Sequence, residues 1–165
     1  MSERDSLLFS SVDAVPWLAV LRRYIVLIAL ANLLWEIAHV PLYTVWQKGS
    51  VAEIAFAVLH CTGGDVLIAT SALLGSLLLL GNSRWPDERY LAVAAFALVV
   101  GLSYTAFSEW LNTSIRRSWA YTDLMPTLPA IGIGLSPLAQ WIAIPLAAFW
   151  LARRPAMART QVVER

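Results

Sequence analysis

VAEIAFAVLHCTGGDVLIATSALLGSLLLL, residues 51–80, contains only two charged side chains, Glu53 and Asp65. About 20 mostly apolar residues suffice for a helix to cross roughly 30 Å of hydrocarbon. This run therefore predicts a membrane-spanning helix. Three further runs meet the same criterion, and they lie at about residues 21–45, 90–115 and 128–152. The expected fold is an all-α integral membrane protein with four transmembrane helices.

The composition supports this class. Hydrophobic residues make up 59% of the chain and charged residues 14%, with a mean hydropathy of +0.65. Soluble domains have about half apolar and a quarter charged residues. The net charge of +1 provides no basic face for nucleic acid, and a single cysteine, Cys61, excludes an intrachain disulfide framework. We interpret residues 1–165 as one polytopic domain in the bacterial inner (cytoplasmic) membrane.

The connections and the basic residues predict the topology. Residues 49–50, 81–87 and 116–129 separate the spans, and such short connections favour an antiparallel bundle. Nine of the twelve Lys and Arg fall on one side of it, which predicts cytoplasmic N and C termini because basic residues are retained there. Residues 6–21 are apolar but interrupted by Asp13 and Pro16, so they are expected to form a short interfacial helix.

Polar residues inside two spans follow a helical spacing. Each set has offsets of 0, 4, 7 and 11, which confines it to a stripe about 60° wide at 100° per residue. The first span carries Asn32, Glu36, His39 and Tyr43. The third span carries Thr105, Glu109, Asn112 and Arg116. Ionisable groups in a membrane are expensive and usually face the bundle interior, so both stripes are candidate parts of a functional site.

The second span adds His60, the pair Gly63-Gly64, and Asp65. Counting a rise of about 1.5 Å per residue from the outer ends puts Glu36 and His60 about 13 Å deep, and His39 and Glu109 about 9 Å deep. Asp65 comes out at about 21 Å and about 140° around the helix from His60. We therefore expect one outward-opening cavity, with Asp65 deeper and offset. Its members are Glu36, His39, His60 and Glu109.

These four side chains are also a candidate metal-binding set. Glu36 and His39 have the Glu-x-x-His spacing of carboxylate-bridged dimetal bundles. A mixed nitrogen and oxygen set suits zinc, iron or manganese. The alternative is a hydrogen-bonded Glu-His pair that only orders the helices. Haem between His39 and His60 is a weaker alternative, because the neighbouring carboxylates do not suit an apolar haem pocket.

Other polar and aromatic residues are expected to complete a ligand-binding pocket around this site. Trp119 and Tyr121 lie in the outward segment 116–129, where they could form a lid or simply anchor the chain at the interface. Gln140 lies in the fourth span. The expected cofactor-binding or ligand-binding residues are Asn32, Tyr43, Asn112, Trp119, Tyr121 and Gln140.

The expected function is an enzyme that acts on a membrane lipid or another apolar small molecule. Catalysis would be metal-assisted or acid–base, because buried carboxylates and a histidine can exchange protons with a substrate. The expected catalytic residues are Glu36, His39, His60, Glu109 and Asp65. The alternatives are a component of a metal-ion or proton transporter, a haem-binding subunit, or an accessory subunit of a membrane complex. A second copy of the chain is a further expected partner.

Overall fold

The computed structural model describes residues 17–154, and every named element in that range is a helix. Four of these helices are long and apolar enough to span a membrane, which confirms the predicted class of membrane-embedded helical protein. They are α2 (Trp17–His39), α4 (Val51–Leu80), α5 (Tyr90–Trp110) and α6 (Leu135–Ala152). Three short elements follow α2 or α5: η1 (Val40–Leu42), α3 (Val45–Lys48) and η2 (Leu111–Ile115). Most of the expected interfacial helix at 6–21 lies outside the described residues, and residues 17–21 belong to α2.

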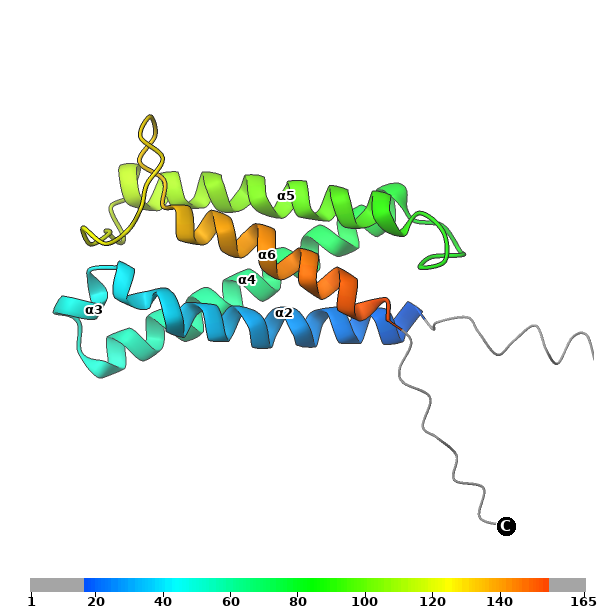
Figure 1. The fold of residues 1–165 in the computed structure, drawn as a ribbon, viewed down its shortest axis with the longest axis horizontal. Coiled ribbons are helices and arrows are strands. Elements are labelled where there is room, and N and C mark those ends of the chain that lie inside the picture. The colour runs from blue at the N-terminus through cyan, green and yellow to red at the C-terminus, as the bar shows by residue number, and fades with distance from the viewer. Residues whose placement is uncertain (1–16, 155–165) are drawn as a thin grey trace, which may run out of the picture.

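The four long helices pack side by side around a common interior. α2 contacts α4 and α6, and α5 contacts the same two helices (Figure 1). α4 runs obliquely across the others (Figure 1). Its 30 residues correspond to a rise of about 45 Å, which exceeds the roughly 30 Å of hydrocarbon in a bilayer. An oblique path accommodates this extra length.

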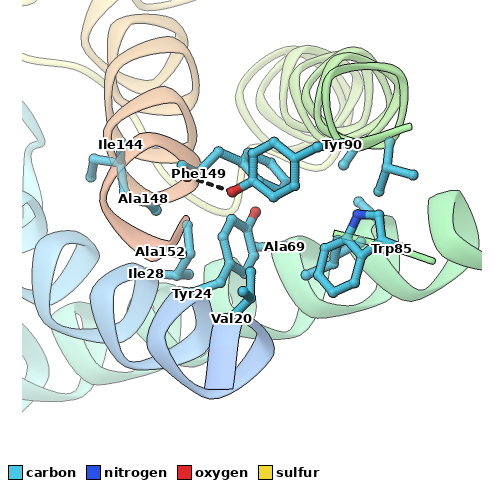
Figure 2. Close-up of a cluster of buried hydrophobic side chains, with 14 of the residues drawn as sticks. Val20, Tyr24, Ile28, Ala69, Trp85, Tyr90, Ile144, Ala148, Phe149 and Ala152 are labelled. Atoms are coloured by element: carbon cyan, nitrogen blue, oxygen red, sulfur yellow. Dashed lines mark hydrogen bonds between the residues drawn. The ribbon is translucent and has the colours of Figure 1, made fainter. Parts of the chain in front are cut away.

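An aromatic cluster fills one end of the bundle (Figure 2). The Tyr90 hydroxyl at the start of α5 donates to the carbonyl oxygen of Phe149 in α6 at 2.5 Å. The Phe149 ring lies 4.4 Å from the Tyr24 ring of α2, measured between centroids. Arg153 lies over Tyr90 at the edge of this cluster. With Ala69 of α4 in the same cluster, the apolar packing holds all four long helices together at the end where α2 begins and α6 ends.

The first and fourth spans differ from the sequence prediction. The first candidate span covers Trp17–Leu42 and the fourth covers Leu135–Ala152, so α6 starts seven residues later than expected. Residues 128–134 are not helical: Thr127 forms an isolated bridge with Gly134, and Gly132 adopts a left-handed backbone with φ of 67°. Glycine accepts this conformation without a Cβ clash. The segment therefore belongs to the loop that covers this end of the bundle.

Gly101 sets the distance between α5 and α6. A Cβ atom built on Gly101 would lie 2.1 Å from Cζ3 of Trp141. The absence of a side chain on α5 thus lets the Trp141 indole of α6 lie directly against the α5 backbone. This close approach also positions the indole nitrogen, which takes part in the candidate site.

Candidate functional site

His39 connects α2 with the beginning of α6. Its Nδ1 lies 2.9 Å from Oγ of Ser136, and its Nε2 lies 3.1 Å from Oε2 of Glu36. The indole Nε1 of Trp35 donates to the same Ser136 oxygen at 3.3 Å. Glu36 and His39 are both buried, whereas Ser136 is half-buried. The three side chains therefore form one continuous line of contacts from a hydroxyl through an imidazole to a carboxyl group.

Gln140 extends this line to α4. Its Nε2 lies 2.8 Å from Oδ1 of Asn32, 3.0 Å from Oε1 of Glu36 and 3.0 Å from Oδ2 of Asp65. The indole Nε1 of Trp141 donates to the second Asp65 oxygen at 3.1 Å. Gln140 is only 2% exposed. One amide group thus links α2, α4 and α6 inside the apolar bundle.

The number of hydrogens on Gln140 constrains the protonation of this cluster. An amide nitrogen carries two hydrogens, yet three oxygens lie within 3.0 Å of it. Asn32 presents its oxygen, because its own Nδ2 donates to the Ile28 carbonyl at 2.8 Å. One hydrogen then remains for two carboxyl groups, and two ionised carboxylates this close would repel each other. The contacts of Gln140 with both carboxyl groups are therefore best satisfied when Asp65 and Glu36 share one proton.

Glu109 forms a second polar contact near the same end of the bundle. The Tyr121 hydroxyl donates to it and also accepts from the backbone N–H of Gly134 at 3.1 Å. The Tyr43 hydroxyl lies 3.5 Å from the same carboxylate oxygen. Burial raises the pKa of Tyr121 above its usual range, and the hydrogen bond to Glu109 adds to the shift. Burial raises the pKa of Tyr43 in the same direction, followed by the charge of Glu109. Both phenols therefore remain hydrogen-bond donors at physiological pH.

Backbone hydrogen bonds hold the loop after α5 across this end. Thr44 N–H donates to the Ala120 carbonyl at 2.9 Å, and Thr122 N–H donates to the Leu42 carbonyl at 2.8 Å. These bonds place Tyr121 beside Tyr43, with ring centroids 5.4 Å apart. The loop, for which a lid and an interfacial anchor were both considered, is thus fixed to the end of η1 and to Thr44.

The structure does not bring His60 to the other candidate residues. His60 is exposed on α4, and its ring stacks on Phe56 with centroids 5.4 Å apart. Asp65 joins the cluster instead, through Gln140 and Trp141, although we expected it to lie deeper and offset. The depth count assumed a helix perpendicular to the membrane. Because α4 is oblique and 30 residues long, counting from its first residue places Asp65 too deep.

The remaining predicted residues have varied positions. Asn112 is half-buried and donates to the Ser108 carbonyl of its own helix at 2.9 Å. Trp119 is half-buried, and its indole nitrogen is buried without a hydrogen-bond partner among residues 17–154. Sequence reasoning missed Ser136, the hydroxyl that contacts His39. The available signal was its position four residues before Gln140, which places both side chains on one face of α6.

The geometry does not support the predicted four-residue metal set. Within residues 17–154, no group of three or more His, Cys, Asp and Glu side chains is arranged to hold a metal ion. Both ring nitrogens of His39 already contact protein groups, namely Ser136 and Glu36. A pair of axial histidines is likewise not formed, because His60 is exposed while His39 is buried. The arrangement is a hydrogen-bonded polar cluster inside the apolar bundle.

Comparisons with other proteins identify no relative of this chain. No protein-family model, no curated protein and no solved structure matches this chain. The residues that carry chemistry must therefore be interpreted from their own contacts.

Proposed function

We propose that the protein is a membrane-embedded enzyme that acts on a lipid or another apolar small molecule by acid–base chemistry at the Glu36–His39 pair. The observation that carries the proposal is the continuous contact from Ser136 through His39 to Glu36. When Nε2 of His39 donates to Glu36, Nδ1 carries a free lone pair and accepts a proton from the Ser136 hydroxyl. The carboxylate stabilises the imidazolium that results.

The carboxyl pair supplies an acid next to this base. Gln140 and His39 hold the two oxygens of Glu36, so the shared proton is placed on Asp65. Asp65 is then a proton donor that connects to the imidazole through Gln140 and Glu36. A site with one base and one acid suits reactions in which a leaving group needs a proton.

The finer topology belongs to this proposal. Arg23 at the start of α2 donates to the Arg154 carbonyl after α6 at 2.6 Å, so arginines gather at the end away from His39. Because basic residues are retained in the cytoplasm, the antiparallel bundle would open its site toward the outside. A lipid in the outer leaflet would then reach Ser136 without crossing the membrane.

A proton transporter is the second candidate, and the two carboxyl groups gathered around one buried amide, Glu36 and Asp65, favour it. Conduction would need further polar groups toward the opposite end. Ser76 lies in that direction along α4, but its hydroxyl donates to the Ala72 carbonyl of its own helix at 2.6 Å. The enzyme proposal therefore accounts for more of the contacts.

The experiment compares variants of the purified protein in liposomes made from a total bacterial lipid extract, with lipid turnover followed by mass spectrometry. Glu36→Gln and His39→Gln are expected to reduce turnover at least tenfold, because each removes a proton-transfer group. His60→Gln is the matched control, since it removes an exposed histidine outside the cluster. Melting temperatures in detergent show whether each variant is folded. Equal turnover for folded His39→Gln and His60→Gln, or no turnover by the unchanged protein, would refute the proposal.

The topology is tested separately by thiol labelling of intact cells on a Cys61→Ala background. Ser50→Cys and Ser118→Cys are expected to react with a membrane-impermeant maleimide, because both exposed positions lie at the site end of the bundle. Ser83→Cys, between α4 and α5, is expected to react only after lysis. Reaction of Ser83→Cys in intact cells would reverse the proposed orientation.

A further inference from the structure

Ser136 has the surroundings of a reactive serine. A serine becomes a nucleophile when a base lies within about 2.6 to 3.2 Å of its hydroxyl, and Nδ1 of His39 lies 2.9 Å from its Oγ. The hydroxyl is half-buried, while the imidazole and carboxyl groups behind it are buried. The nucleophile is thus the member of the line that a substrate can reach first.

Glu36 is held firmly enough to orient the imidazole. Its Oε2 contacts His39 and its Oε1 receives the Gln140 amide at 3.0 Å. Both oxygens are therefore engaged, and the carboxylate is fixed in direction. In serine enzymes such a carboxylate keeps the histidine in the tautomer that accepts the hydroxyl proton.

The depth of Ser136 indicates the substrate class. Ser136 is the second residue of the span Leu135–Ala152, so it lies within about 3 Å of the end of that span along the helix. The interfacial regions that contain lipid polar groups extend the bilayer from about 30 Å of hydrocarbon to about 40–45 Å. The ester groups of membrane lipids join the acyl chains to these polar groups, so they lie at the level of Ser136.

We propose that Ser136 is the nucleophile of a Ser136–His39–Glu36 triad that cleaves or transfers the acyl group of a membrane-lipid ester. This inference rests on the proposed function and names its reaction. Oγ forms a bond to the ester carbonyl carbon while Nδ1 of His39 takes the hydroxyl proton. The bond from that carbon to the alcohol oxygen breaks, and His39 returns the proton to the departing alcohol. Water or a second hydroxyl then attacks the acyl carbon, and His39 takes the proton of this attacking group. The bond from the acyl carbon to Oγ breaks, and His39 returns the proton to Ser136.

Trp35 is the side chain best placed to assist this step. Its indole N–H donates to Ser136 Oγ at 3.3 Å, so it orients the hydroxyl whose proton Nδ1 of His39 accepts. A nucleophile held in the attacking geometry reacts faster. Trp35→Phe retains an aromatic ring but lacks the N–H, and it is expected to slow acylation of Ser136 several-fold without removing it.

An alkyl fluorophosphonate tests the nucleophile directly, because it forms a bond from phosphorus to an activated serine oxygen as fluoride leaves. The full-length protein in liposomes is expected to gain one adduct, which peptide mass spectrometry should locate at Ser136. Ser136→Ala should lose the adduct, and Glu36→Gln should acquire it at least tenfold more slowly. Ser103→Ala, which changes an exposed serine on α5, should react like the unchanged protein.

No adduct on the unchanged protein, an adduct at another residue, or undiminished labelling of Ser136→Ala would overturn the inference. Locating the adduct on the unchanged protein tests the inference even when Ser136→Ala does not fold. Lipid turnover separates this inference from the proposed function. If folded Ser136→Ala retains turnover that His39→Gln loses, acid–base catalysis stands and the nucleophile is rejected. If every variant retains turnover, the proposed function itself fails.

Discussion

Replacing Gly101 by alanine is expected to lower the free energy of unfolding by about 3 kcal/mol, because overpacking costs about 1–3 kcal/mol and a buried hydrogen bond is lost as well. The added Cβ would lie 2.1 Å from Cζ3 and 2.7 Å from Cε3 of Trp141. Both atoms belong to a ring that is 4% exposed, so the indole cannot move aside freely. Any displacement also weakens the bond from its Nε1 to Asp65.

Thermal melting in detergent measures this effect, and two other glycines provide controls. A Cβ on Gly63 or Gly75 would meet no atom within 4 Å. Alanine is preferred over glycine inside a helix by about 1 kcal/mol, so Gly63→Ala and Gly75→Ala are expected to melt at the same temperature as the unchanged protein or higher. A Gly101→Ala protein as stable as these controls would show that α5 and α6 do not approach so closely.

The four spans could be predicted from the sequence because their signal is local. Each apolar run is long enough by itself to cross the membrane, so the central part of each span can be recognised without knowing which helices pack against it. The beginning of α6 was less predictable, since residues 128–134 are apolar but contain Pro129 and Gly132. Their backbone is fixed by a bridge from Thr127 to Gly134 and by contacts with the covering loop. Hydropathy does not detect such contacts.

The candidate site was predictable only within one helix at a time. The 3.6-residue period correctly placed Asn32, Glu36 and His39 on one buried face of α2. Asp65 and His60 lie about 140° apart around α4, so only one of them can face Gln140, and packing selects Asp65 while His60 stays exposed. No local pattern in residues 51–80 shows which of these two faces is buried.

Ser136 was overlooked for a different physical reason. A serine in a membrane helix commonly satisfies its hydroxyl on its own backbone, as Ser76 does by donating to Ala72. Only the position of α2 beside the first turn of α6 gives Ser136 a histidine partner. The chemical meaning of this residue thus arises from tertiary packing rather than from its type or spacing.

Replacing Gln140 by leucine is expected to lower the free energy of unfolding by about 3 kcal/mol or more, because each buried acceptor left without a donor costs about 1–3 kcal/mol. The two hydrogens of this amide are shared among three oxygens, on Asn32, Glu36 and Asp65, so up to two acceptors would lose their donor. Leucine has a similar volume, so the loss would reflect hydrogen bonding rather than a cavity. Gln47→Leu, on the exposed surface of α3, is the matched control and is expected to change stability little.

A double-mutant cycle with Asp65→Leu shows whether the cost comes from the shared network. Removing both partners of a buried contact is less harmful than the two single changes suggest, because neither Gln140 nor Asp65 is then left facing a partner that is gone. The double variant is therefore expected to be at least about 1 kcal/mol more stable than the sum of the single changes predicts, which lies within the range for residues in one network. Denaturant unfolding of the four proteins in detergent measures the four free energies. Strict additivity would mean that Gln140 and Asp65 act independently, and the single proton assigned to Asp65 and Glu36 would then lose its support.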